Sequence, residues 1–230
     1  MDDDVLELNF WPSFADMMLA LVLILVLVLA VVTVVLKAGT VSLGHVKNNQ
    51  REVVKAIASF YGGREKEIEP DTFAIYITNE ANYDLLIHNE PQLQQITFSD
   101  HVLFRPDDTK LNPRGVEVLS NVGKTLKDRL PLIKEIQIQG HADPDSTTRF
   151  PSNTHLAALR AIEVFKFLQL SVGIDPAEHL MSATSFGEFK PTTRSGGDMQ
   201  YNRDRLRVDN ATPEMKGRNR RIELLLFYRL

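Results

Sequence analysis

Residues 17–36 form a run of twenty residues in which Thr33 alone lies outside the hydrophobic class. At about 1.5 Å per residue, a helix of this length spans about 30 Å, the thickness of a bilayer's hydrocarbon core. A cleaved signal peptide is the alternative, but its apolar stretch is about 7–15 residues long and follows a basic start. Here the run is longer and its start is acidic. We therefore predict a retained single-pass transmembrane helix over residues 11–37.

The charges on the two sides of this span are distributed unevenly. The chain has 26 Lys and Arg against 30 Asp and Glu, and the excess of four acids equals the four acids in residues 1–10. No basic residue precedes the span, whereas Lys37, Lys47, Arg51 and Lys55 follow it. Because basic residues favour the cytoplasmic side, this bias by itself predicts a cytoplasmic C-terminal part. The balanced charge of the remaining chain gives no indication of a nucleic-acid partner.

Asp16 lies at the start of the span, directly before its apolar run. A carboxylate inside a bilayer costs several kcal/mol, so it tends to be neutralised, paired or placed beside water. One interpretation is a carboxyl that carries an ion as its access alternates between the two sides. The other is a capping box, in which Ser13 caps the helix and the helix dipole favours Asp16 three residues later. Spacing alone leaves both interpretations open.

Residues 38–94 are predicted to form a stem and linker with short strands. Strands are expected at residues 72–77 and 84–87, with a turn at residues 79–82. Apolar residues near helical spacing predict a short amphipathic stem helix, namely Val46, Val53, Val54, Ile57 and Phe60.

In the second half, predicted helices alternate with predicted strands. Asn112 before Pro113 is typical of an N-cap and first turn, and Val116, Leu119, Val122 and Leu126 would give that helix its apolar face. A further helix is expected at residues 154–170, and strands at residues 101–104, 133–139, 180–185 and 222–228. We therefore predict a single N-terminal transmembrane helix followed by an α/β sandwich domain with helices on one sheet face.

Three sequence blocks in this half carry a resemblance to a known domain. They are Gly-His-Ala-Asp at residues 140–143, Asn-Thr-His-Leu-Ala-Ala-Leu-Arg-Ala at 153–161, and Asn-Arg-Arg-Ile-Glu at 219–223. In this order they resemble the OmpA-like peptidoglycan-binding domain of OmpA, Pal and MotB, with patterns G-H-T-D, N-x-x-L-S-x-x-R-A and N-R-R-V-E. The resemblance covers residues 95–230. The three substituted positions are mild departures, while the loops at 143–153 and 191–217 are longer than in that pattern.

The chemistry of these blocks suits a diaminopimelate side chain, which ends in an ammonium and a carboxylate on one carbon. Asp143, just after a strand, can accept from the ammonium, and Arg160 on the following helix can bind the carboxylate with two N–H groups. The resemblance assigns these roles to these positions and places Asn153 and Leu156 in the same pocket. Asn153 is also expected to cap its helix. Arg220 is the fifth candidate, with neighbouring Arg221 as the alternative.

Several other interpretations of these residues compete with a peptidoglycan site. Asp143 and Arg160 could form a structural ion pair, and residues 143–145 could belong to a calcium loop, although too few further oxygen ligands lie nearby. The eight basic and four acidic residues of 194–221 predict a solvated loop rather than a nucleic-acid patch, because aromatic residues are sparse there. His141, His155 and His179 lack a metal-ligand spacing and are expected to pack or to lie on the surface.

Neither a nucleophile–base pair nor a phosphate-binding glycine loop is recognisable in the sequence, and cysteine is absent, so thiolate metal sites are excluded. We therefore expect neither an enzyme nor a bound cofactor or metal.

The N-terminal stretch carries a second resemblance. Pro12 and Asp16, separated by three residues and followed by one apolar span, resemble the B subunits of ion-driven membrane motors, including MotB, ExbD and TolR. Phe-Trp-Pro-Ser-Phe-Ala-Asp at residues 10–16, the short acidic tail and the compact length are similar to the ZorB family of Zorya anti-phage defence systems.

This second resemblance implies that Asp16 carries H⁺ or Na⁺ and that a homodimer lies within a ring of ZorA-like (MotA-like) subunits. It also implies a bacterial inner-membrane protein with residues 1–10 in the cytoplasm and the C-terminal domain in the periplasm, against the charge bias. A flagellar MotB-type subunit and an envelope tether that binds peptidoglycan without motor activity remain the alternatives.

Overall fold

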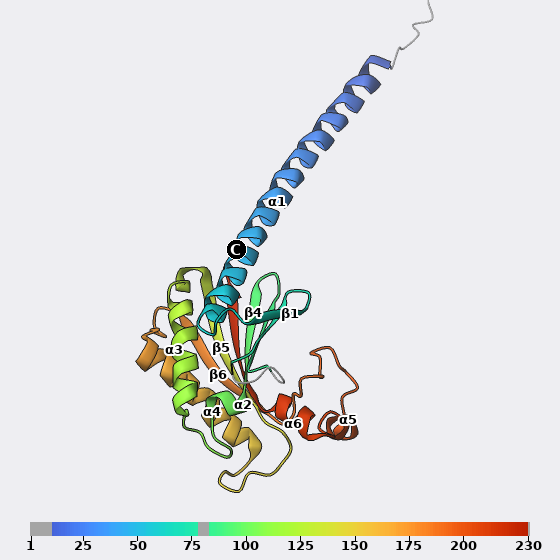
Figure 1. The fold of residues 1–230 in the computed structure, drawn as a ribbon. Coiled ribbons are helices and arrows are strands. Elements are labelled where there is room, and N and C mark those ends of the chain that lie inside the picture. Colours follow the sequence, from blue (N-terminus) through green and yellow to red (C-terminus); the bar gives the residue numbers. More distant parts are fainter. Residues whose placement is uncertain (1–10, 78–82, 230) are drawn as a thin grey trace, which may run out of the picture. The chain divides into compact units, whose positions relative to one another are not determined.

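The structure is a computed structural model that describes residues 11–77 and 83–229 (Figure 1). It divides into two units, Met1–His45 and Val46–Leu230. The acidic tail at residues 1–10 and the predicted turn at 79–82 lie outside the described residues.

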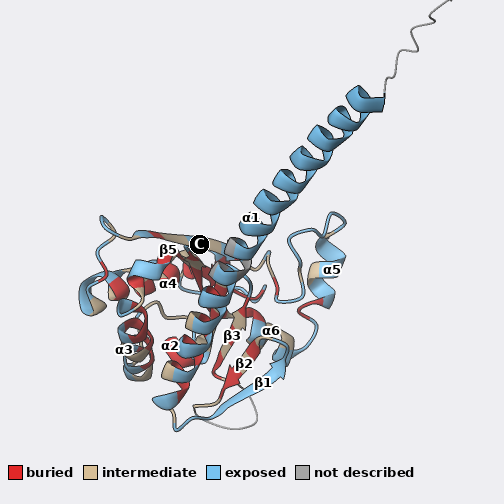
Figure 2. Cartoon of the chain, turned by 90° about the horizontal axis from the view of Figure 1, so that it is seen from above, coloured by how far each residue is buried: buried red, intermediate tan, exposed pale blue. Residues whose placement is uncertain are grey.

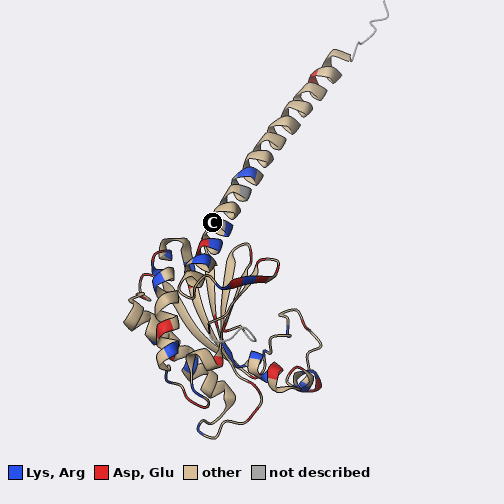
Figure 3. Ribbon diagram, in the orientation of Figure 1, with Lys and Arg blue, Asp and Glu red and all other residues tan. Residues whose placement is uncertain are grey.

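Helix α1 runs from Trp11 to Ser59, and its residues up to His45 belong to the first unit. The stretch Trp11–Lys37 is long and apolar enough to cross a membrane, and its side chains are exposed (Figure 2). Figure 3 shows a long part of α1 without charged residues. The hydroxyl of Thr33 donates to the carbonyl of Leu29 at 2.7 Å, which satisfies that polar group within the helix.

The start of α1 tests the capping box predicted for Ser13 and Asp16. Trp11 is already helical, so Ser13 lies inside the helix and cannot be its N-cap. The predicted capping box of Ser13 and Asp16 is therefore wrong. Asp16 lies within the helix, directly before the apolar run.

The second unit is built on a seven-stranded sheet in the order β1-β2-β3-β4-β7-β5-β6. β5 and β6 are parallel, and the other neighbouring strands are antiparallel. The strands are β1 (Glu65–Glu69), β2 (Thr72–Ile75), β3 (Leu85–Asn89), β4 (Leu93–Ser99), β5 (Ile133–His141), β6 (Leu180–Gly187) and β7 (Arg221–Tyr228).

The core of this unit lies against one face of the sheet. It is covered by α3, by α4 and by residues 46–59 of α1. Strand alternation places Ile136 and Ile138 of β5 and Leu224 of β7 in this core. The helices are α2 (Asp100–Leu103), α3 (Pro113–Lys127), α4 (Asn153–Phe167), α5 (Arg203–Val208) and α6 (Pro213–Asn219), with a 3₁₀ turn at Leu130–Leu132 and a π-helical turn at Leu168–Val172.

The predicted fold class is confirmed, and so are the strands at 133–139, 180–185 and 222–228. The predicted cap of α3 is also confirmed, because the Asn112 side chain accepts from the Gly115 N–H at 2.7 Å. The expected face of this helix is partly wrong: Val116 is 40% exposed and Val118 is buried. Val118 follows Gly115 by three residues and so shares its face, whereas Val116 does not.

The predicted strand at residues 101–104 is wrong. The Phe104 N–H donates to the Asp100 carbonyl at 2.9 Å, which closes one helical turn, α2. A short apolar run such as Val102–Leu103 is compatible with a strand or with one turn of helix, so periodicity cannot separate them. The strand of this region is β4, which the sequence pattern does not predict.

The predicted boundary of the folded domain at residue 95 also differs from the structure, in which the second unit begins at Val46. Val53 and Ile57 of the predicted stem helix are fully buried in the core. The buried Gln50 side chain donates to the Glu90 carbonyl at 2.8 Å. The backbone carbonyl of Gln50 accepts from the Gln94 side chain at 2.9 Å. Residues predicted as a linker are thus part of the domain.

Candidate functional site

A cavity of about 650 Å³ lies beside the end of β5 and the first turns of α4. All five residues predicted to bind peptidoglycan line it, namely Asp143, Asn153, Leu156, Arg160 and Arg220. The structure therefore brings together side chains from three sequence blocks.

Asp143 is a buried carboxylate two residues beyond the end of β5. Its Oδ1 accepts from the Asp145 N–H at 3.1 Å, and its Oδ2 is paired with the guanidinium of Arg220. A carboxylate has about four acceptor positions, so these two contacts leave room for a further donor. The side chain can accept an ammonium from the cavity while it remains paired with Arg220.

Asn153 holds the loop that carries Asp143, because its Nδ2 donates to the Asp143 carbonyl at 3.0 Å. The predicted capping role of Asn153 is wrong. Ser152 is the N-cap of α4, and its hydroxyl accepts from the His155 N–H at 3.1 Å. Asn153 begins the helix, which leaves its amide free to turn toward the loop.

Arg160 is buried on the inward face of α4 and is held in one orientation. Its Nη1 lies 3.0 Å from Asp100 Oδ1, its Nε donates to the Asp108 carbonyl at 2.8 Å, and its Nη2 donates to the Arg105 carbonyl at 3.2 Å. These contacts use three of the five N–H groups of the guanidinium. Since Arg160 is paired with Asp100, and Asp143 with Arg220, the alternative of an Asp143–Arg160 ion pair is wrong.

Asp100 is a cavity residue that the sequence pattern does not predict. It is the first residue of α2, where the helix dipole favours an acid. Because the sequence pattern predicts a strand at 101–104 instead of this helix, it does not identify Asp100 as a helix-start residue. Burial raises the pKa of its carboxyl, and the nearby Arg160 and Arg220 oppose that shift only in part. The cavity therefore contains a partly exposed carboxyl, Asp100, and a buried one, Asp143, facing two arginines.

The long loop at 143–153 is fastened to the opposite wall of the cavity by Asp107. The Asp107 carboxylate accepts from Thr147 Oγ1 at 2.5 Å and from Thr148 Oγ1 at 3.0 Å, and its carbonyl accepts from Arg149 Nη1 at 3.0 Å. The Thr147 hydrogen bond is the main cause that lowers the pKa of Asp107. The additional residues of this loop thus form an ordered wall.

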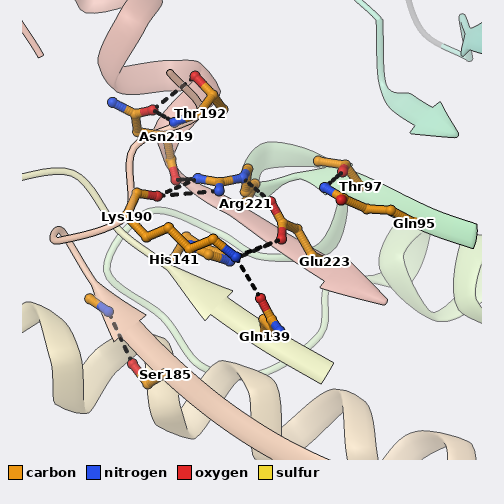
Figure 4. A network of polar contacts seen from close by, with 11 residues as sticks. Gln95, Thr97, Gln139, His141, Ser185, Lys190, Thr192, Asn219, Arg221 and Glu223 are labelled. Atoms are coloured by element: carbon orange, nitrogen blue, oxygen red, sulfur yellow. Dashed lines mark hydrogen bonds and ion pairs between the residues drawn. The ribbon is translucent and has the colours of Figure 1, made fainter. Parts of the chain in front are cut away.

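Arg221 does not line this cavity but belongs to a buried polar cluster on the other face of the sheet (Figure 4). Its Nε donates to Glu223 Oε1 at 2.6 Å, and His141 Nε2 lies 3.4 Å from Glu223 Oε2. The His141 ring stacks on Phe186 at a centroid distance of 5.3 Å, as expected for a packing histidine. Arg220 and Arg221 therefore point to opposite faces of β7, and Arg220 is the one at the cavity.

The predicted solvated loop at 194–221 is wrong in part, because it contains α5 and α6. Asn219 fastens this segment to the sheet: its Oδ1 accepts from the Thr192 N–H at 2.8 Å and its Nδ2 donates to the Asp209 carbonyl at 3.0 Å. The asparagine that begins the third sequence block is therefore a structural residue, buried at the base of the segment.

The buried cluster predicts that the domain loses stability in mild acid. Burial lowers the pKa of His141, so below its usual value of 6.5 the unfolded chain takes up a proton that the folded chain does not. Stability present above pH 6.5 is therefore lost as the pH falls. Burial alone would raise the pKa of Glu223, but His141, Arg221 and Lys190 together hold it at about 2, so its contribution is lost only below pH 4.5.

Urea unfolding of the full chain in detergent at pH 7.5 and pH 5.5 measures this effect. We expect a lower midpoint at pH 5.5, and a smaller pH difference for His141→Gln than for the control His155→Gln, whose side chain is exposed. An undiminished pH difference in His141→Gln would assign the acid sensitivity to other groups.

Comparisons with known proteins agree with this geometry. Residues 103–205 match the OmpA family. A MotB-like protein from Desulfovibrio vulgaris superposes with a TM-score of 0.53 at 24% identity, covering 78% of this chain and 94% of that protein. The periplasmic domain of Helicobacter pylori MotB superposes with a TM-score of 0.52 at 19% identity, covering 73% of this chain and 89% of that domain.

A search of curated protein sequences finds no match to the chain. The family match lies within the second unit, and the two superpositions show a shared fold. The chain thus combines one N-terminal apolar helix with an OmpA-like domain that has the fold of MotB periplasmic domains.

Proposed function

We propose that the chain is the B subunit of an ion-driven membrane motor and that its OmpA-like domain anchors the motor to peptidoglycan. The observation that carries the proposal is the cavity in which Asp143, Asn153, Leu156, Arg160 and Arg220 converge from three separate blocks. A motor must push against a fixed point, and binding to the cell wall supplies one.

The cavity suits the free end of diaminopimelate. The ammonium is bound by Asp143, which keeps acceptor positions beyond its contacts with Asp145 and Arg220. The carboxylate is bound by the remaining N–H groups of Arg160, which Asp100 and two backbone carbonyls hold in a fixed orientation. Leu156 packs against the aliphatic carbons between these charged groups and the rest of the peptide.

Asp16 is the ion-carrying residue in this proposal, with H⁺ or Na⁺ as the transported ion. Its position inside α1, directly before an uncharged run, supports a role other than capping. A carboxylate at the edge of an uncharged span favours neighbouring helices, because such a group tends to be paired or placed beside water. We propose a homodimer of this helix within a ring of MotA-like subunits.

The Zorya anti-phage system is the setting we favour, because residues 10–16 resemble ZorB more closely than flagellar MotB. The ring subunit is then ZorA-like. The protein lies in a bacterial inner membrane with its C-terminal domain in the periplasm, because peptidoglycan is accessible only there. This topology opposes the charge bias around the span.

Binding to purified peptidoglycan sacculi tests the anchoring role. Asp143→Asn removes the charge that pairs with the ligand ammonium, so we expect the full chain in detergent to bind sacculi at least about tenfold more weakly. The control is Asp198→Asn, an exposed residue that does not line this cavity.

A second arm of the same experiment compares sacculi that contain diaminopimelate with sacculi that contain lysine, which lacks the terminal carboxylate. We expect the wild type to prefer the former. Equal binding by Asp143→Asn and wild type, with both proteins folded, would contradict the assignment of this cavity.

A further inference from the structure

A second cavity of about 250 Å³ lies next to the first, on the sheet face opposite the core. Gln95 and Thr97 of β4 form its floor, and they alternate with the core residues Ile96 and Phe98. The segment after β6 forms its wall and contributes Lys190 and Arg194. From residue 191 onward this segment is longer than the OmpA-like pattern predicts.

The charged groups of the second cavity are mostly cationic. One carboxylate, Glu223, lines it together with four cations, namely Lys190, Arg194, Arg218 and Arg221. Arg221 already neutralises that carboxylate through the 2.6 Å contact between its Nε and Glu223 Oε1. Three positive charges therefore remain in excess around a cavity that is large enough for a small anionic group.

Two of these cations are held in place largely by neutral groups, although Lys190 Nζ also lies 3.9 Å from Glu223 Oε2. The Arg194 guanidinium lies 4.1 Å from the centroid of the Tyr201 ring, and its Nη1 donates to the Phe189 carbonyl. Lys190 Nζ donates to Gln139 Oε1 at 3.1 Å and lies 4.6 Å from the Phe186 ring centroid (Figure 4). Such preorganised cations lose little conformational entropy when they bind an anion.

The two cavities are contiguous, because Tyr83, Ser99 and Arg218 line both of them. Arg218 forms no ion pair with any residue that the structure describes. A ligand held in the first cavity by its zwitterionic end can therefore extend past Ser99 toward the cationic group around Arg194.

We propose that the second cavity binds a second carboxylate of the same wall peptide, that of the acidic residue joined to diaminopimelate. This inference rests on the proposed function of the first cavity. In the wall peptide the acidic residue is linked through its side chain, so its backbone carboxylate is free. Amidation of that carboxylate removes its charge, so the site discriminates between amidated and unamidated wall peptides.

Two synthetic dipeptides test the proposal by calorimetric titration of the full chain in detergent. One is γ-D-glutamyl-diaminopimelate, and the other carries an amide in place of the free carboxylate of its glutamyl residue. We expect the wild type to bind the acid about fivefold to tenfold more tightly than the amide. Arg194→Gln should remove this preference without changing affinity for the amide, because Arg194 lines only the second cavity.

Two matched variants accompany this titration. Arg194→Lys keeps the charge without the planar fork and should retain part of the preference. Arg207→Gln, on the exposed side of α5 and outside both cavities, should retain all of it.

The outcomes separate the two proposals. Equal wild-type affinity for the acid and the amide, or a full preference in Arg194→Gln, would overturn the second-cavity assignment alone. If neither dipeptide binds the wild type, the proposed function of the first cavity fails as well.

Discussion

Replacing Gly140 with Ala is expected to destabilise the domain by about 3 kcal/mol and to abolish binding to peptidoglycan. A Cβ at this position would collide with the carbonyl oxygen of Ala157 and would lie 2.8 Å from its carbonyl carbon. Both contacts are with backbone, so no side-chain rotation relieves them. β5 is paired on both sides, with β6 and β7, and therefore α4 must move away.

That movement would disturb both ends of the site. Asp143 follows Gly140 by three residues, and Arg160 follows Ala157 by three residues on α4. Chemical unfolding measures the loss of stability, and sedimentation with sacculi measures the loss of binding. The matched control is Gly196→Ala, because a Cβ at Gly196 meets nothing within 4 Å. An unchanged unfolding midpoint in Gly140→Ala would show that the close packing of β5 and α4 is not required.

Replacing Asp16 with Asn is expected to eliminate ion-driven output and to leave binding to sacculi unchanged. An amide of nearly the same size preserves the helix but cannot take up and release a proton or neutralise a bound Na⁺. The two readouts are ion flux in proteoliposomes that contain the chain with its ring subunit, and protection of cells against phage. We expect both to fall to background.

Asp16→Glu keeps a carboxyl and is the matched control, with partial output expected. Full output from Asp16→Asn would contradict the motor proposal and favour a tether that only links membrane and wall. If the wild type gives ion flux but does not protect cells against phage, a flagellar MotB-type role is favoured instead. Because sacculi binding is measured on the same variants, loss of the ion site is distinguished from loss of the anchor.

The features that the sequence predicts correctly are those with a local signature. Residues 17–36 identify a span because an apolar run of that length has few other uses. Asn112 before Pro113 identifies a helix start because both side-chain effects act within one turn. Alternation of apolar residues identifies β5, and the three sequence blocks identify the residues of the cavity through their resemblance to a known domain.

The errors arise where local patterns are ambiguous. Val102–Leu103 is too short a run to distinguish a strand from the single turn of α2, and this ambiguity conceals Asp100. The predicted linker contains the buried Gln50, Val53 and Ile57. A stem helix with one apolar face has the same sequence pattern whether that face packs on its own domain or on a partner.

By itself, then, the amino-acid sequence determined that this protein has one apolar span with a carboxylate at its start, and which residues are candidates for binding. Tertiary structure alone decided how their charges pair. Arg220 reaches Asp143 across 77 residues because β7 lies antiparallel to β5 with Arg221 opposite His141, and the same register turns Arg221 to the other face. Arg160 meets Asp100 because the fold brings the start of α2 and the inward face of α4 to the same cavity. Such pairings depend on strand order and register, which local periodicity does not encode.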